Sequence, residues 1–255
     1  MYGEKIKKEK IFVFVIPMAG KGERFLKAGY KMPKYMIEVN GKTLFEYSLE
    51  SLPLDIADIV IFIGLEEHDK DYKLKNFIHE KVKKYSLKNY EILLLKEYTR
   101  GQAETVYKAK DIIDPNSNLS IYNIDTYFYD PTLKYELLNM QYDGIIGGFF
   151  LDCKDEKWSF AKVNDNMIVT KVAEKEQISN IALTGFYNFS EAHLFFNVAE
   201  KWIKEGKTVR GEFYIAPMYN DLIEQGKKFK IKLVEKFIPL GTPEDVENFR
   251  KKGSC

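Results

Sequence analysis

The first half of the chain alternates short apolar runs with amphipathic segments. Four runs rich in β-branched and aromatic residues predict buried strands, at Ile11–Pro17, Ile59–Gly64, Glu91–Leu95 and Leu119–Asn123. Strands that alternate with helices are typical of a largely parallel, right-handed sheet that is covered on both faces. In such sheets, ligands bind at the carboxyl ends of the strands.

Three helices are expected between these strands. Thr43 and Glu46 have the spacing of a capping box, which predicts a helix that continues to about Leu52. Amphipathic spacing predicts a second helix over about 69–84. A third is expected over 102–113, where an Asp-Pro pair stops it.

The second half changes character. Short strands are predicted at 144–151, 160–163, 168–173 and 183–189, then helices over about 191–205 and 214–225, a strand over 228–235 and a last helix from about Thr242. No repeat, low-complexity tract or linker separates the halves. We therefore expect a single domain over residues 1–255, with a nucleotide-binding half at about 10–130 and an acceptor-binding half at about 131–250.

Composition narrows the class of protein. Among 255 residues, 39 Lys and Arg nearly balance 38 Asp and Glu, which argues against nucleic acid as a partner. No run approaches the roughly 18 apolar residues of a membrane span, so no membrane partner is expected. The two cysteines, Cys153 and Cys255, do not make a disulfide framework, and a cytoplasmic location fits them. A homo-oligomer stays open.

A glycine loop after the first predicted strand carries the most specific chemistry. It consists of Met18, Ala19, Gly20, Lys21 and Gly22. Glycines let backbone N–H groups approach phosphate oxygens. Arg24, and Lys34 after Pro33, add positive charge for oxygens that become more negative during a reaction. The loop is therefore expected to bind a polyphosphate at the edge of the sheet.

The sequence of this loop can be compared with the known patterns of phosphate-binding loops. A dinucleotide fingerprint needs a third glycine where Phe25 stands, and the P-loop pattern is absent. An ordinary glycine turn would not need Arg24 or the Pro33 and Lys34 pair. The pattern G-x-G-x-R-F followed by P-K resembles the signature of nucleotidyltransferases that join an NTP to a phosphorylated small molecule, most often a sugar-1-phosphate.

Asp125 follows the strand predicted to end at Asn123. A carboxylate at the carboxyl end of a strand can hold a divalent cation against phosphates, and Mg²⁺ prefers one or two carboxylates together with phosphate oxygens and water. The alternative is that Asp125 only caps a turn. The histidines have no spacing that indicates a zinc site.

Further motifs follow along the chain in the same order as in the nucleotidyltransferases. In the family, the turn at residues 98–106 holds the nucleobase, which implies roles for Thr99, Gly101 and Gln102. The resemblance implies that Glu174 binds acceptor hydroxyls and that Lys175 binds the acceptor phosphate. Acceptor contacts are also expected from residues in T-G-F and G-E-F motifs, namely Thr184, Gly185 and Glu212.

Glu174 and Lys175 pose a geometric problem. Neighbouring residues of a strand point to opposite faces, so a turn or bulge is needed if both are to face one pocket. The alternative is a charged surface strand.

The ordered set of motifs resembles the sugar-nucleotidyltransferase family over nearly the whole chain, and within it capsule-locus members. This resemblance implies a three-layer α/β fold with a mostly parallel, mixed central sheet, Rossmann-like and similar to the GT-A fold. It implies Mg²⁺-dependent transfer of a nucleoside monophosphate, with Arg24, Lys34 and Asp125 as catalytic residues and Asp125 as metal ligand.

One position departs from the family pattern. The better-known members have a second metal-binding aspartate two residues before a G-T pair near the end, where this chain has Pro239. Either Asp125 works with another carboxylate such as Glu212, or the metal relies on phosphates and water.

Two other functions compete with this one. A glycosyltransferase of the same general fold would commonly hold its metal with D-x-D, whereas this chain has Asp125, Thr126 and Tyr127. A non-catalytic nucleotide-binding module would be compatible with Pro239. Pyrimidine nucleotides (CTP, or UTP or dTTP) are favoured, and a non-sugar phosphorylated acceptor stays open.

Overall fold

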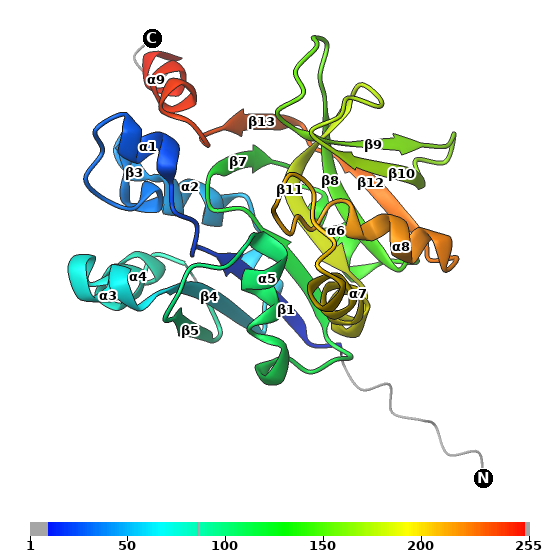
Figure 1. The fold of residues 1–255 in the computed structure, drawn as a ribbon, viewed down its shortest axis with the longest axis horizontal. Coiled ribbons are helices and arrows are strands. Elements are labelled where there is room, and N and C mark those ends of the chain that lie inside the picture. The colour runs from blue at the N-terminus through cyan, green and yellow to red at the C-terminus, as the bar shows by residue number, and fades with distance from the viewer. Residues whose placement is uncertain (1–9, 86, 253–255) are drawn as a thin grey trace.

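A computed structural model describes residues 10–85 and 87–252 (Figure 1). Cys255 lies outside these residues. The first half contains β1 (Phe12–Pro17), α1 (Glu23–Lys27), η1 (Lys34–Met36), β2 (Glu38–Val39), β3 (Lys42–Thr43), α2 (Leu44–Glu50), η2 (Leu54–Ile56), β4 (Ile59–Leu65), α3 (Glu66–Tyr72), α4 (Leu74–Val82), β5 (Tyr90–Leu95), α5 (Gln102–Tyr107), η3 (Lys110–Ile112) and β6 (Asn118–Tyr122).

The second half is richer in strands. It contains β7 (Thr126–Tyr129), α6 (Leu133–Leu138), β8 (Gly144–Phe150), β9 (Ser159–Val163), β10 (Val169–Glu174), β11 (Ile181–Phe189), α7 (Ala192–Glu205), α8 (Met218–Glu224), β12 (Phe229–Leu233), β13 (Lys236–Pro239) and α9 (Pro243–Lys252). Among the described residues, none of these helices is long and apolar enough to cross a bilayer.

One mixed sheet runs through both halves. Its path is β10-β9-β11-β6-β1-β4-β5, and β8 and β12 join it beside β11. The strands β6, β1, β4 and β5 are all parallel, whereas β11 runs antiparallel to β6, β8 and β9. The predicted fold class, a mixed central sheet flanked by helices, is confirmed.

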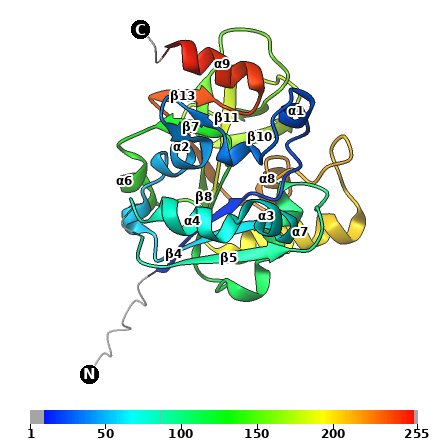
Figure 2. The same cartoon turned by 90° about the vertical axis from the view of Figure 1, so that its left-hand side faces the viewer.

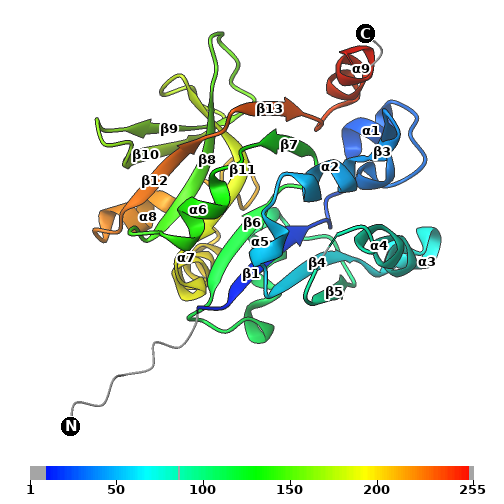
Figure 3. The ribbon, with the colours of Figure 1, turned by 180° about the vertical axis from the view of Figure 1, so that it is seen from behind.

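Strand alternation explains the three layers. Val13 and Val15 of β1 belong to a core shared with α5, α7 and α8, while Phe14 and Ile16 belong to a core shared with α2, α4 and α6. Figure 1 shows α5 and α7 in front of the sheet, and Figure 3 shows α2 and α6 in front of it from behind. Because β1 is buried on both faces, every one of its central residues is apolar.

A smaller unit packs at the carboxyl end of this sheet. The strand β13 pairs antiparallel with β7, and α9 lies against them (Figure 2). Phe25 of α1, Leu240 and Val246 share a separate small core there. The last quarter of the chain is thus brought next to the loop that follows β1.

Most predicted strands are present, and several helices need correction. The helix expected over 69–84 was wrong as one element, because Lys73 takes a left-handed conformation (φ 54°) between α3 and α4. The helix over 102–113 ends at Tyr107 and gives way to the 3₁₀ turn η3. The helix expected from 214 begins at Met218. The strands β2, β3, β7 and β13 and the helices α1 and α6 were not predicted.

The capping box at Thr43 forms as predicted. The Glu46 carboxylate accepts hydrogen bonds from the Thr43 backbone N–H (3.0 Å) and hydroxyl (2.9 Å). It also receives Lys81 and Lys84, each at 2.7 Å, and so ties α2 to the end of α4. Burial alone would raise the pKa of Glu46, but these two ammonium groups and Thr43 lower it to about 2.

We predict that Glu46→Gln lowers the free energy of unfolding by about 1–3 kcal/mol at pH 7, because it removes the buried negative charge that Lys81 and Lys84 contact. A lowered pKa stabilises the protein above the ordinary value of 4.5, and this stabilisation is lost as the pH falls through about 2. Urea unfolding from pH 7 to pH 2 should therefore show the gap between wild type and variant closing below about pH 4.5. The control Glu50→Gln removes an exposed pair with Lys42 and should cost under about 0.5 kcal/mol. Equal losses in both variants would contradict the assignment.

Candidate functional site

The glycine loop lies at the carboxyl end of β1. The Met18 N–H donates to the Ile63 carbonyl (2.7 Å), so the loop is fastened to the end of β4. A Cβ added at Gly20 would meet no atom within 4 Å, and Gly20 is exposed. Crowding by the protein therefore does not require glycine here, and the open backbone is accessible to an approaching ligand. Gly22 has a left-handed φ of 62°, a conformation that favours glycine.

Lys34 and Asp125 form the central contact of the site. The Lys34 Nζ lies 2.6 Å from Asp125 Oδ2, and both side chains are about one-fifth exposed (21%). A Cβ on Gly22 would lie 4.0 Å from the Cβ of Lys34, so the loop borders this pair. The structure thus brings the glycine loop, Lys34 and Asp125 together, as the sequence predicts.

The C-terminal segment closes around the same carboxylate. The Leu240 N–H donates to the Asp125 carbonyl (3.0 Å), and Pro239 pairs with Thr126 across β13 and β7. A Cβ on Gly241 would lie 3.3 Å from Asp125 Oδ2, so the lack of a side chain there leaves room beside the carboxylate. Leu240 between them is fully buried in the small core that it shares with Phe25 and Val246.

These features fit a divalent cation held by a single protein carboxylate. Asp125 is half-buried at a strand end, with space beside Gly241. Within residues 10–85 and 87–252, no group of three or more His, Cys, Asp or Glu side chains could hold a metal ion. The charge of Glu212 acts on Glu174 and Tyr214, which groups Glu212 with the acceptor residues.

The predicted base turn docks on the second half of the chain. The Phe213 N–H donates to the Arg100 carbonyl (2.8 Å), and the Ala103 N–H donates to the Phe213 carbonyl (3.0 Å). Gly101 has a φ of 142°, and a Cβ there would lie 2.6 Å from the Phe213 nitrogen. Thr99 shares a 2.6 Å hydrogen bond with Thr105. The turn is therefore held rigidly by backbone contacts.

Gln102 and Gly185 meet at Asn123. The Gln102 amide donates to Asn123 Oδ1 (2.5 Å), and a Cβ on Gly185 would collide with the Asn123 amide. Thr184 is buried, with its hydroxyl oxygen accepting the Phe186 N–H at 3.3 Å. Asn123, which sequence reasoning did not single out, thus links the base turn to β11.

Glu174 and Lys175 diverge from the strand as their predicted roles require. Glu174 ends β10 and accepts a hydrogen bond from the Ser159 hydroxyl. Lys175 follows with a left-handed φ of 56°, which breaks the strand alternation. Its ammonium group donates to the Tyr214 hydroxyl and lies 4.5 Å from the centre of the Tyr214 ring.

Electrostatic effects link the predicted acceptor residues with one another. Burial is the main cause of the raised pKa of Glu174; Glu212 adds to it, while Ser159 and Lys175 oppose it. Burial likewise raises the pKa of Tyr214, with Glu212 and Glu174 adding and the positive charge of Arg24 opposing. Arg24, exposed on α1, therefore lies within electrostatic range of the acceptor residues.

Comparison with known proteins identifies the family. A family model described as "Nucleotidyl transferase" matches residues 14–230. The chain belongs to the nucleotidyl transferase family. The match spans both the loop after β1 and the predicted acceptor residues Glu174 and Lys175.

Relatives of this nucleotidyl transferase domain differ in length and substrate. A solved nucleoside-diphosphate-sugar pyrophosphorylase from Vibrio cholerae RC9 has a TM-score of 0.80 and 33% identity, covering 93% of this chain and 99% of that one. The 2-C-methyl-D-erythritol 4-phosphate cytidylyltransferase of Thermosipho melanesiensis is 26% identical, over 88% of this chain and 92% of the relative. The bifunctional protein GlmU of Methanococcus maripaludis is 26% identical over 91% of this chain but only 52% of the relative, so this chain spans about half its length.

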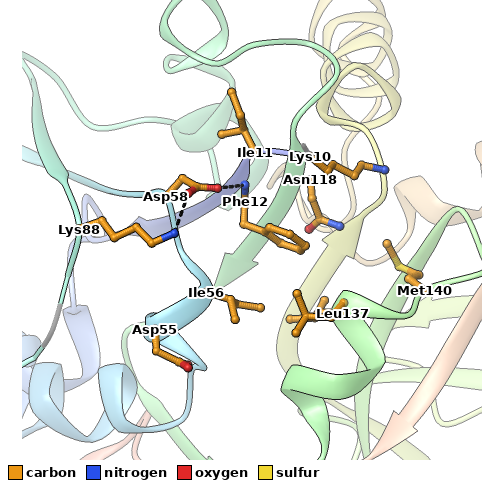
Figure 4. A pocket seen from close by; sticks show the side chains of 11 residues that line it. Lys10, Ile11, Phe12, Asp55, Ile56, Asp58, Lys88, Asn118, Leu137 and Met140 are labelled. Atoms are coloured by element: carbon orange, nitrogen blue, oxygen red, sulfur yellow. Dashed lines mark hydrogen bonds and ion pairs between the residues drawn. The ribbon is translucent and has the colours of Figure 1, made fainter. Parts of the chain in front are cut away.

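A hollow of about 600 Å³ lies elsewhere on the transferase domain, at the opposite edge of the sheet (Figure 4). Lys10, Phe12 and Asn118 line it at the amino ends of β1 and β6, and Asp58 there bonds Lys88 and the Phe12 N–H. None of the predicted site residues lines this hollow. The predicted site residues lie instead at the carboxyl ends of the parallel strands, the edge at which open α/β sheets bind ligands.

We predict that Gly101→Ala costs at least about 2 kcal/mol more than Gly206→Ala in free energy of unfolding. Both glycines have a positive φ, but only the Cβ at residue 101 would collide with backbone, at 2.6 Å from Phe213, while residue 206 faces open space. Urea titration of both variants tests this. Equal losses would show that the docked base turn is not rigid.

Proposed function

We propose that this protein is a Mg²⁺-dependent nucleotidyltransferase that transfers a nucleoside monophosphate from an NTP to a phosphorylated small molecule and releases pyrophosphate. The NTP is a pyrimidine nucleotide, and the acceptor is a sugar-1-phosphate used for capsule or other surface polysaccharide. The observation that carries the proposal is the ion pair of Lys34 and Asp125 beside the glycine loop, at 2.6 Å, with the cation Lys175 in the acceptor half.

The reaction needs charge neutralisation and positioning, and no covalent enzyme intermediate. An oxygen of the acceptor phosphate forms a bond to the α-phosphorus of the NTP, while the bond from that phosphorus to the bridging oxygen breaks and pyrophosphate leaves with the electron pair. The acceptor phosphate is already anionic, so no base has to remove a proton. The barrier arises from bringing two anions together, which fixed cations can lower.

Each residue has a distinct task in this proposal. The backbone N–H groups of Gly20 and Gly22 and the Arg24 guanidinium bind the β- and γ-phosphates that leave. Lys34 contacts the α-phosphate. Part of its present contact with Asp125 is replaced by this contact with the phosphate. Lys175 draws in the acceptor phosphate, and Glu174 accepts hydrogen bonds from acceptor hydroxyls.

Asp125 would be the protein ligand of Mg²⁺, with phosphate oxygens and water as the others. Bound there, the ion would neutralise phosphate charge. The room beside Gly241 and the half-buried carboxylate support this assignment. Because Pro239 stands where better-known members have a second aspartate, phosphate oxygens of the nucleotide would supply the other negative ligands of the ion.

The relatives support the substrate classes. Similarity to a nucleoside-diphosphate-sugar pyrophosphorylase supports a sugar phosphate as the acceptor. Similarity to a cytidylyltransferase supports CTP as the nucleotide and keeps a non-sugar phosphate possible as the acceptor. Lys21 of the loop has its Nζ 5.5 Å from the centre of the Tyr98 ring, at the start of the base turn, and Thr99 and Gln102 of that turn would supply polar groups for a pyrimidine edge. A cytoplasmic location would give access to the NTP pool.

The direct experiment measures pyrophosphate release with Mg²⁺, testing each NTP against sugar-1-phosphates, phosphorylated polyols and phosphorylated amino alcohols. We expect release that requires one pyrimidine NTP and one phosphorylated acceptor. Hydrolysis or transfer from a nucleotide-sugar, without pyrophosphate release from any NTP, would instead indicate a glycosyltransferase. Nucleotide binding without any turnover would indicate a non-catalytic module.

We predict that Arg24→Ala and Asp125→Ala each lower kcat/KM by at least about 100-fold, since each removes charge stabilisation from the reacting phosphates. Lys27→Ala is a matched control on α1, where Lys27 is 81% exposed, and its rate should stay within about twofold of wild type. Circular dichroism would confirm that all variants fold. Near-normal rates in both site variants would reject the site assignment.

A further inference from the structure

Tyr214 makes two contacts with Lys175 that the proposed transfer reaction does not explain. The Lys175 ammonium donates to the Tyr214 hydroxyl and lies 4.5 Å from the ring centre. A lysine side chain has four rotatable bonds and loses considerable entropy when it is fixed. A phenol that contributes both a hydrogen-bond acceptor and a ring face restricts that ammonium group strongly.

The backbone around this pair is also restrained. Lys175 (φ 56°) and Arg210 (φ 50°) both take left-handed conformations that non-glycine residues seldom adopt. The Lys175 N–H donates to the Trp158 carbonyl (2.9 Å), and Arg210 Nη2 donates to the Lys175 carbonyl (3.2 Å). Both ends of the lysine residue, backbone and ammonium, are therefore held.

Charged groups from both halves of the molecule act on Tyr214. Its phenol is affected by Arg24 from the loop after β1 and by Glu174 and Glu212 from the second half. It also follows Phe213, whose backbone is bonded to the base turn at Arg100 and Ala103. A group in this place can couple the position of Lys175 to the nucleotide-binding half.

We propose that Tyr214 is a positioning residue that holds the Lys175 ammonium group where the acceptor phosphate binds. The inference rests on the proposed function. The phenol oxygen occupies one donor of the ammonium group, and the other two stay directed to phosphate oxygens. The fixed ammonium group strengthens the binding of an acceptor only where that acceptor carries a phosphate. Tyr214 therefore favours phosphorylated acceptors over unphosphorylated ones.

The variant Tyr214→Phe keeps the ring and removes the hydroxyl. We expect KM for the phosphorylated acceptor to rise about fivefold to tenfold, because the ammonium group is no longer preset. KM for the NTP should change by less than twofold, a split that general damage to the fold would not produce. If the phenol instead only competes with the phosphate, KM for the acceptor would fall, and that result, or no change, would overturn the inference.

The control Tyr135→Phe removes an equal hydroxyl from α6, where Tyr135 is 66% exposed, and should leave both KM values within twofold. Titration calorimetry with inorganic phosphate separates this inference from the proposed function, since it needs no turnover. Phosphate binding that is present in wild type and lost in Lys175→Met is the binding due to this subsite. We expect Tyr214→Phe to weaken the affinity of that binding about fivefold to tenfold.

The calorimetric outcomes are independent of the substrate panel. Weakened phosphate binding in Tyr214→Phe without transferase activity in wild type would reject the proposed function alone. Transfer by wild type with unchanged phosphate affinity in Tyr214→Phe would reject the role of Tyr214 alone. Phosphate binding that does not depend on Lys175 would also overturn the inference.

Discussion

The ion pair between Lys34 and Asp125 is the contact on which the site depends. Lys34 follows the glycine loop, and Asp125 lies in the connection between β6 and β7. The two residues are 91 positions apart in the chain, so their contact joins distant segments. Both side chains are mostly buried, so the pair is screened less than a surface pair would be. The ammonium group balances the carboxylate, and neither charge is left alone in a low-dielectric crevice. A phosphate that arrives can take over part of the lysine contact at little desolvation cost.

The rest of the site is assembled by close backbone approach between the two halves. Phe213 forms backbone hydrogen bonds with the base turn, and the Asn123 N–H donates to the Gly185 carbonyl of β11 at 3.3 Å. Such contacts do not depend on flexible side chains, so they fix the nucleotide and acceptor residues relative to each other. Transfer between two bound phosphates requires this fixed spacing, because small misplacements of reacting groups cost large factors in rate.

Sequence reasoning recovered what local pattern encodes. The runs around Val15 and Phe62 are buried on both faces and were predicted as strands, and the capping box at Thr43 formed. Features set by distant contacts were missed. The helix expected from residue 214 could not begin there because the preceding Phe213 backbone is bonded to the base turn. Tyr214 carries no sequence signal of its own, since its importance comes from a lysine 39 residues away.

Charge arrangement explains why this site suits the joining of two anions. The proposed function assigns Arg24, Lys34 and the loop N–H groups to the nucleotide and Lys175 to the acceptor. The Tyr214 hydroxyl accepts a hydrogen bond from Lys175, and the charge of Arg24 also acts on this phenol. Each phosphate would thus meet its own cation before the two come together, which offsets their mutual repulsion. A single carboxylate at Asp125, itself paired, keeps the centre of the site from repelling the nucleotide.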